Sequence, residues 1–309
     1  MNTDDATKSA AAQNGSNNNQ IAVARILKAY YFWQMTDRWG PIPYTQALKG
    51  RENFKPAYDS QEFIYTDLFK ELKEAAAQIT SGSIDGDLLL DGDMARWKTF
   101  ANSMRLVMAL RLSEVKPDVA KAEFVSAYQA GVISSNAGNV VYNFLADENN
   151  DNPWQDRFQT RLDFNISKPM ADLMLATNDP RLPVFADVAV LTQKYVGMPY
   201  GLEQGAAGAI PNGQVSFLGI DMREQSSPGY VMTYSQMQFS LAEGAMRGWI
   251  TGDAKTFYEA GIKASFEQYG VYNAANYAAF IANPAVAYSP AKGKEQIICV
   301  RRTRPQSVT

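Results

Sequence analysis

Apolar residues recur at helical spacing along most of this 309-residue chain, so the sequence predicts a mainly α-helical protein. The first helix is expected over about residues 19–38 and carries many aromatic side chains. Gly40 can close that helix in a left-handed conformation, and Pro41 cannot continue it. The same spacing predicts further helices over about 59–79, 93–116, 118–130, 168–177, 234–249, 254–269 and 273–281.

Several helix starts are marked by residues that can cap a helix. Asp59 with Glu62, and Ser235 with Gln238, have the spacing of a capping box, in which each side chain bonds the other residue's backbone N–H. Asp93 and Asp118 are expected to cap the helices that follow them.

The stretch from residue 133 to residue 229 breaks the pattern, because Gly, Pro, Asn and Asp recur at short intervals. Only 168–177 is expected to be helical there, and 184–190 and 195–200 are candidates for extended chain. Long irregular stretches inside a domain often carry function.

The late helices are joined by a tight turn at Gly252–Asp253, with small residues where two helices would cross. That layout is typical of tetratricopeptide-like helical hairpins, although no strict 34-residue repeat is present. We therefore expect a flexible Asn/Ala/Ser-rich segment over 1–20, a single domain over 21–298, and an aberrant tail over 299–309.

Composition excludes several classes of function. The chain has no histidine, so it cannot form a Ser-His-Asp triad, a Cys-His dyad or a His-ligated metal site. Cys299 is the single cysteine, and it falls in the expected tail. With 29 basic and 32 acidic residues there is no basic excess, so nucleic acid is not an expected partner. No apolar run reaches the ~18 residues of a membrane span, and no signal peptide begins the chain.

The most polar loop, residues 147–154, has alternating Asp147, Asn149 and Asp151, as at the start of a calcium-binding loop. Asn152 and Phe158 stand where such a loop needs Gly and Glu, so a solvated loop is the better interpretation. Asp87 and its acidic neighbours in 85–93 are interpreted as turn formers. No catalytic residue, metal site or cofactor is predicted.

Aromatic side chains in the irregular region are the candidates for ligand binding. A ring face can stack on a pyranose, while nearby amides and carboxylates bond its hydroxyls; alternatively, the rings anchor loops to the helical core. Trp154 is the strongest candidate because polar residues flank it on both sides. The predicted ligand-binding residues are Trp154, Asp156, Tyr195, Tyr200 and Tyr230, and Phe217 shares the region.

Five segments in order resemble the SusD/RagB-like family of outer-membrane nutrient-binding lipoproteins of Bacteroidetes. Each is weak alone, but their order and spacing are fairly specific. They are Asp37 to Ala47 with Trp39-Gly40-Pro41-Ile42-Pro43-Tyr44; Pro56 to Leu68; Gly86 to Arg105 with Trp97 and Phe100-Ala101-Asn102-Ser103; Asp179 to Gly201; and Tyr234 to Ser265 with Gly252-Asp253-Ala254.

The resemblance implies a tetratricopeptide-like scaffold with a loop-rich face. It also implies a lipid-anchored protein on the outward-facing surface of the outer membrane. The implied function is non-catalytic binding of an oligosaccharide, or occasionally a peptide, which is delivered to a SusC-like TonB-dependent transporter, as in a starch utilization system. Membrane attachment would be only through a lipid anchor.

The chain is expected to be an incomplete member of this family. The family's signal peptide, anchoring cysteine and leading helices have no counterpart, and the family pattern stops after Glu295-Gln296-Ile297-Ile298. Two other functions remain open: a helical-repeat adaptor that binds only protein segments, and a glycoside hydrolase with a carboxylate pair. A glycan array separates the first of these from sugar binding.

Overall fold

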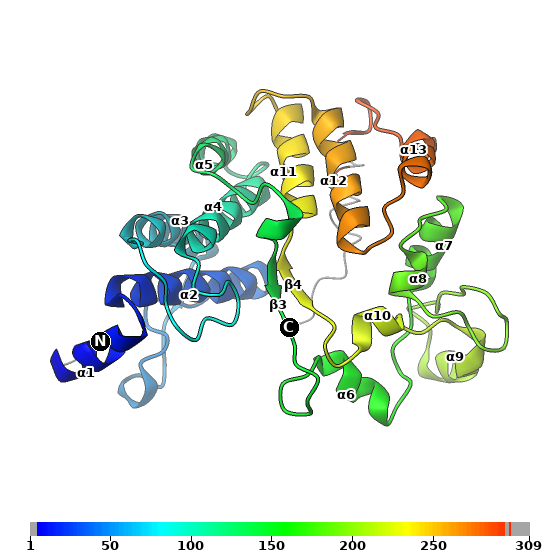
Figure 1. Cartoon of the computed structure of the whole chain (residues 1–309), viewed down its shortest axis with the longest axis horizontal. Coiled ribbons are helices and arrows are strands. Elements are labelled where there is room, and N and C mark those ends of the chain that lie inside the picture. The colour runs from blue at the N-terminus through cyan, green and yellow to red at the C-terminus, as the bar shows by residue number, and fades with distance from the viewer. Residues whose placement is uncertain (1–4, 294–296, 298–309) are drawn as a thin grey trace. The chain divides into compact units, whose positions relative to one another are not determined.

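The computed structural model describes residues 5–293 and Ile297, and the predicted mainly helical fold is confirmed (Figure 1). The expected tail 299–309, with Cys299, lies outside the described residues. The chain forms two compact units, Met1–Ser134 and Ser135–Thr309, which are described separately. The single domain expected over 21–298 stays a prediction. None of the described helices is long and apolar enough to span a bilayer.

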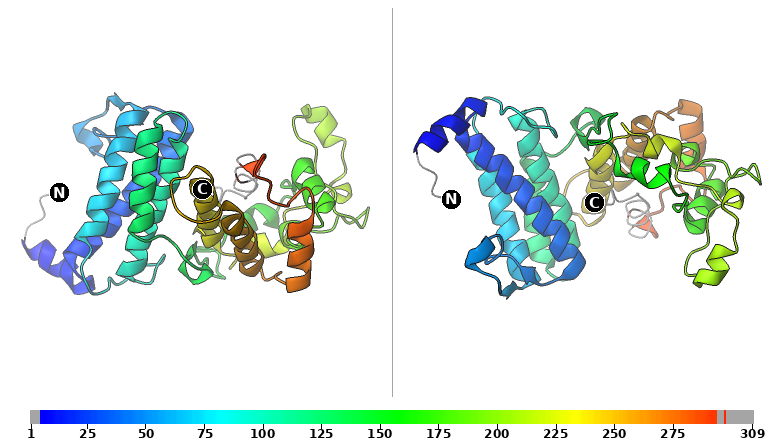
Figure 2. Two further views of the ribbon diagram at one scale, coloured as in Figure 1. Left: turned by 90° about the horizontal axis from the view of Figure 1, so that it is seen from above. Right: turned by 90° about the horizontal axis from the view of Figure 1, so that it is seen from below.

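The first unit consists mainly of long helices packed side by side, as both views of Figure 2 show. Its elements are α1 (Asp5–Ala11), η1 (Ala12–Asn14), α2 (Asn17–Trp39), β1 (Ile42–Pro43), η2 (Gly50–Glu52), β2 (Tyr58–Asp59), α3 (Gln61–Gln78), α4 (Met94–Arg111) and α5 (Pro117–Gln129). The two short strands pair antiparallel, with Ile42 opposite Asp59.

The core of this unit uses the faces that the spacing predicted. Ile26 and Trp33 of α2 are buried, as are Ile64 and Leu72 of α3. At the edge of the α2–α3 contact, Arg25 pairs with carboxylates of α3, at 2.9 Å from Glu71 and 2.7 Å from Glu74. Gly40 ends α2 with a positive φ of 72°, as expected, although its ψ of −124° is not that of a left-handed helix; its N–H donates to the Thr36 carbonyl at 2.8 Å.

The segment 1–20, expected to be flexible, contains helix α1 from Asp5 and the first turn of α2 from Asn17. Amide side chains at its end bond backbone groups. Gln20 Nε2 donates to the Ala11 carbonyl at 2.7 Å, and buried Asn19 exchanges two hydrogen bonds with the backbone of Thr80. The flexibility expected of this segment from its composition stays a prediction.

Several predicted caps were displaced by a few residues. Ser60 caps α3 in place of Asp59, whose carboxylate accepts from the N–H groups of Tyr44 and Thr45. Thr233, not Ser235, caps α11. Helix α5 begins at Pro117 after Lys116, and Asp118 lies in its first turn. At the first two of these starts another capping residue lies one or two positions away, so local sequence could not choose between the two candidates.

The second unit has a helical part and an irregular part. Its elements are η3 (Asn136–Gly138), β3 (Val140–Tyr142), α6 (Pro153–Gln159), α7 (Lys168–Ala176), α8 (Leu182–Phe185), α9 (Gln204–Gly208), η4 (Asn212–Gln214), α10 (Ile220–Arg223), β4 (Gly229–Met232), α11 (Tyr234–Met246), α12 (Ala254–Gln268) and α13 (Ala274–Ala282). Strands β3 and β4 pair antiparallel, with Val140 opposite Met232.

Helices α11 and α12 form the hairpin that the small residues predicted (Figure 1). A Cβ on Gly261 would lie 2.9 Å from the Phe239 ring, so glycine is what allows this close crossing. Tyr258 lies in the core between them, where its hydroxyl donates to the Val286 carbonyl at 2.8 Å.

The irregular region, residues 133–229, is held together by isolated bridges and by one buried serine. Ser216 is fully buried; its N–H donates to the Val196 carbonyl, and its own carbonyl accepts from Ile166 N–H. Its Oγ accepts from Val196 N–H at 3.0 Å. Of the stretch 184–190 expected to be extended, the first two residues belong to α8. Because these hydrogen bonds satisfy its backbone groups, the irregular region can keep a fixed conformation and position side chains for binding.

Candidate functional site

Helix α6 is fixed by the buried side chain of Asn152, which caps it. Asn152 Oδ1 accepts from Trp154 N–H at 2.9 Å, while Nδ2 donates to the carbonyls of Met222 at 3.3 Å and Ser227 at 3.0 Å. Its own N–H donates to the Gln225 carbonyl at 2.8 Å. One amide therefore ties the start of α6 to the end of α10 and the loop after it.

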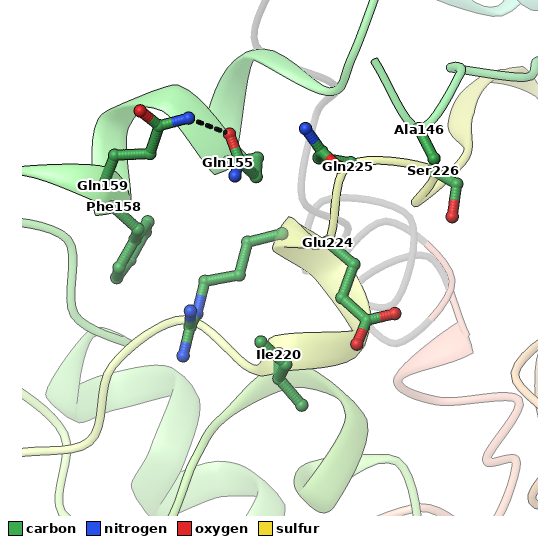
Figure 3. A pocket seen from close by; sticks show the side chains of 9 residues that line it. Ala146, Gln155, Phe158, Gln159, Ile220, Glu224, Gln225 and Ser226 are labelled. Carbon is green, nitrogen blue, oxygen red and sulfur yellow. Dashed lines mark hydrogen bonds between the residues drawn. The ribbon is translucent and has the colours of Figure 1, made fainter. Parts of the chain in front are cut away.

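A pocket of about 440 Å³ lies between α6 and α10 (Figure 3). Helix α6 supplies one wall, and α10 with the following loop supplies the other. The lining residues are Ala146, Gln155, Phe158, Gln159, Ile220, Arg223, Glu224, Gln225 and Ser226. The lining thus combines one aromatic ring with several groups that form hydrogen bonds.

The cation of the pocket, Arg223, is held by three contacts. Its Nη2 lies 2.6 Å from Asp187 Oδ2, and its Nε donates to the Leu218 carbonyl at 2.8 Å. The guanidinium also lies over the Phe158 ring, 4.5 Å from its centroid. These contacts fix both the charge and the ring beneath it.

The amides of the pocket are only partly paired. Gln159 Nε2 donates to Gln155 Oε1 at 2.8 Å, as the dashed line in Figure 3 shows, and Gln225 Nε2 lies 3.4 Å from Asp151 Oδ2. An amide offers two donors and an acceptor, so Gln155, Gln159 and Gln225 keep capacity for a ligand. Such groups suit the hydroxyl and acetamido groups of a sugar.

Trp154 and Phe158, four residues apart on α6, belong to an aromatic group beside the pocket. The Trp154 ring meets Phe164 edge-on at 5.0 Å, and Phe158 lies 6.2 Å from both Phe164 and Phe217. Arg157 stacks over Trp154 at 5.9 Å. The sequence allowed either ligand binding or loop anchoring for Phe217, and its ring packs within this aromatic group.

The structure brings together only part of the predicted ligand-binding set. Trp154 is half-buried and Asp156 is exposed, and both lie on α6 next to pocket residues. The Tyr200 side chain is 73% exposed, and it does not line the pocket.

The other two predicted tyrosines pack inward. Tyr195 contacts a buried cluster that includes Ile166 and Phe185. The Tyr230 ring lies 5.9 Å from that of Tyr269, and burial raises the pKa of its hydroxyl. Their positions favour the anchoring role that the sequence left open.

Sequence reasoning missed Phe158 and the three glutamines, because it expected a loop where α6 begins. The available signal was Asn152-Pro153, a good cap followed by proline in the first turn, with Trp154 and Phe158 at helical spacing. Across 5–293 no cluster of carboxylates or thiols is arranged to hold a metal ion.

The chain matches one protein-family model over residues 1–302, that of a SusD-like family described as starch-binding and associating with the outer membrane. No curated protein matches it.

Solved structures show the same fold. A chitin-binding protein is 30% identical with a TM-score of 0.81, over 94% of this chain and 66% of that one. A chitin-binding SusD homologue from Flavobacterium johnsoniae is 29% identical with a TM-score of 0.81, over 96% of this chain and 67% of that one. A SusD homologue from Bacteroides fragilis is 27% identical with a TM-score of 0.79, over 94% and 69%. The chain thus spans about two thirds of the length of these proteins.

Proposed function

Because the chain belongs to the SusD-like family, which is described as starch-binding and associated with the outer membrane, we propose that it binds an oligosaccharide without cleaving it. The observation that carries the proposal is the pocket between α6 and α10, where the Phe158 ring and three glutamines lie together. The ring contacts the apolar face of a sugar, and the amides bond its polar substituents.

Trp154 and Asp156 extend this surface along α6, and Tyr200 offers an exposed ring elsewhere in the same unit. We keep all three as proposed ligand contacts. Tyr195 and Tyr230 stay in the proposed set only as residues that position the loops, because their rings are packed against other side chains.

The lining of the pocket favours binding over hydrolysis. Glycoside hydrolysis generally needs two carboxyl groups facing the same bond. Among the nine described lining residues, Glu224 is the sole acid. Incubation with the oligosaccharides below, followed by chromatography, should return them intact; release of shorter products would overturn the non-catalytic assignment.

The binding test uses calorimetry on the full chain with maltohexaose and with the β-1,4-linked hexamer of N-acetylglucosamine. The second ligand is included because two similar structures are of proteins described as chitin-binding. We expect Phe158→Ala to weaken binding at least about fivefold, since truncating an aromatic contact commonly costs over ~1 kcal/mol. Phe54→Ala is the control, because Phe54 is 79% exposed in the other unit.

Delivery to a TonB-dependent, SusC-like transporter from a lipid-anchored position on the outer surface is the cellular part of the proposal. Co-purification of the chain with a transporter encoded beside it tests this. If a transporter segment binds while a broad glycan array gives no signal, the chain acts as a protein adaptor and sugar binding is wrong.

A further inference from the structure

The two charged side chains that line the pocket, Arg223 and Glu224, differ in whether they already have a partner. Arg223 is occupied by Asp187 and by the Leu218 carbonyl, with Phe158 beneath it, so its charge is already neutralised. Glu224 lines the same pocket, is exposed, and has neither an ion-pair nor a hydrogen-bond partner for its carboxylate among the described residues. A ligand therefore meets an unpaired negative charge and a paired positive one.

The surrounding segments strengthen this imbalance. Residues 146–159 and 220–226, which include all the lining residues, contain six carboxylates and two guanidiniums. The second guanidinium, Arg157, stacks over Trp154 and Phe164 and does not line the pocket. A surface with one sign of charge attracts ligands of the opposite sign and repels those of the same sign.

We propose that the pocket between α6 and α10 selects neutral sugars and, above all, positively charged amino sugars, and rejects sugars that carry uronate or sulfate groups. The proposal rests on the oligosaccharide binding proposed above and adds its specificity. Glu224 accepts a charge-assisted hydrogen bond from a ligand ammonium group, while the glutamines bond the uncharged hydroxyls. An acidic sugar is rejected because its charge faces Glu224, and the described lining residues offer no unpaired cation to it.

The test uses three β- or α-linked hexamers that differ in charge: glucosamine (cationic), N-acetylglucosamine (neutral) and galacturonic acid (anionic). The first two share one backbone and differ in whether the 2-amino group is free or acetylated, so the change in their affinity ratio on removing the Glu224 charge isolates the effect of that charge. Calorimetry at pH 6 on the full chain should show the glucosamine hexamer binding about threefold to fivefold more tightly than its acetylated counterpart, which is the worth of one exposed ion pair. The galacturonate hexamer should bind at least tenfold more weakly than either.

Glu224→Gln keeps the shape of the side chain and removes its charge, so it should abolish the preference for the glucosamine hexamer over the N-acetylglucosamine hexamer. Asp221→Asn is the matched control, since Asp221 lies on α10, which ends just before Glu224, carries the same charge and does not line the pocket. Raising the salt from about 20 mM to about 500 mM should also erase the preference in the unmodified chain.

An unchanged preference in Glu224→Gln, or an equal loss in Asp221→Asn, would overturn the specificity while leaving oligosaccharide binding intact. Tight binding of galacturonate by the unmodified chain would do the same. Failure of the unmodified chain to bind any of the three hexamers or maltohexaose would instead refute the function on which the specificity rests.

Discussion

Replacing Asp87 by alanine should strongly destabilise the first unit. The carboxylate closes the loop between α3 and α4 by accepting four hydrogen bonds. Leu89 and Leu90 N–H donate to Oδ1 at 3.0 and 3.2 Å, while Gly92 N–H and Trp97 Nε1 donate to Oδ2 at 2.9 and 2.7 Å. The sequence predicted a turn former here, and the structure confirms that role.

The size of this loss of stability depends on which of the four N–H donors can find another hydrogen-bond partner once the carboxylate is gone. The Trp97 side chain is fully buried, so its indole N–H would be left unsatisfied at a cost of about 1–3 kcal/mol. Of the three backbone N–H groups, that of Leu89 belongs to a partly exposed residue and those of Leu90 and Gly92 to buried ones, so each loses about 1 kcal/mol. We expect Asp87→Ala to cost about 3–5 kcal/mol in total, and Asp87→Asn to cost at least half of this, since one of its two polar atoms would face two donors with an NH₂ group.

Urea denaturation, monitored by circular dichroism, measures the decrease in the free energy of unfolding. Hydrogen exchange of the peptide 83–97 shows whether this decrease arises in the loop. Asp85→Ala is the matched control, because Asp85 lies in the same loop and its side chain is exposed. Equal midpoints for Asp87→Ala and Asp85→Ala would refute the reasoning.

The same carboxylate should make the stability of the loop depend on pH. Burial opposes ionisation of Asp87, but the bonds from Leu89, Trp97, Gly92 and Leu90 outweigh it, and the pKa lies below its usual value. A lowered folded pKa means that the contribution is complete above the unfolded pKa of ~3.9 and is lost as the pH falls through the folded value. The gap between wild type and Asp87→Ala should therefore stay constant from pH 7 to about pH 5 and shrink below pH 4; a gap independent of pH down to 2 would exclude this origin.

Further changes test the second unit and the remaining core. Asn152→Ala removes the α6 cap and leaves the carbonyls of Met222 and Ser227 without their donor. It should lower the free energy of unfolding in urea by about 1–3 kcal/mol and weaken hexamer binding. Unaltered binding would show that the position of α6 does not depend on these hydrogen bonds. Tyr258→Phe removes a buried hydroxyl from the Val286 carbonyl and should cost about 1 kcal/mol with no effect on binding, and a variant as stable as wild type would show that the bond contributes nothing. Gly261→Ala should cost about 1–3 kcal/mol because its Cβ would meet the Phe239 ring; full stability would mean that the α11–α12 crossing can relax.

The sequence by itself was enough to determine the helical class and most of the long helices. Periodic apolar residues such as Ile26 and Trp33, or Ile64 and Leu72, mark a face that must be buried, and that constraint is local. Gly40 ended α2 for an equally local reason, since its backbone conformation is unfavourable for other residues. The five ordered motifs likewise sufficed to place the chain in its family.

Tertiary structure decided which residues surround the pocket. Asn152 reaches the carbonyls of Met222 and Ser227, about 70 residues away, and Arg223 pairs with Asp187 across 36 positions. No spacing rule reports contacts at that separation, so the sequence could place Phe158 beside Trp154 on one helix but could not show that Arg223 and Glu224 lie opposite them. For the same reason the inward packing of Tyr195 and Tyr230 was hidden: a ring in an irregular segment stacks on a ligand or on the core according to which surface the folded chain brings to it.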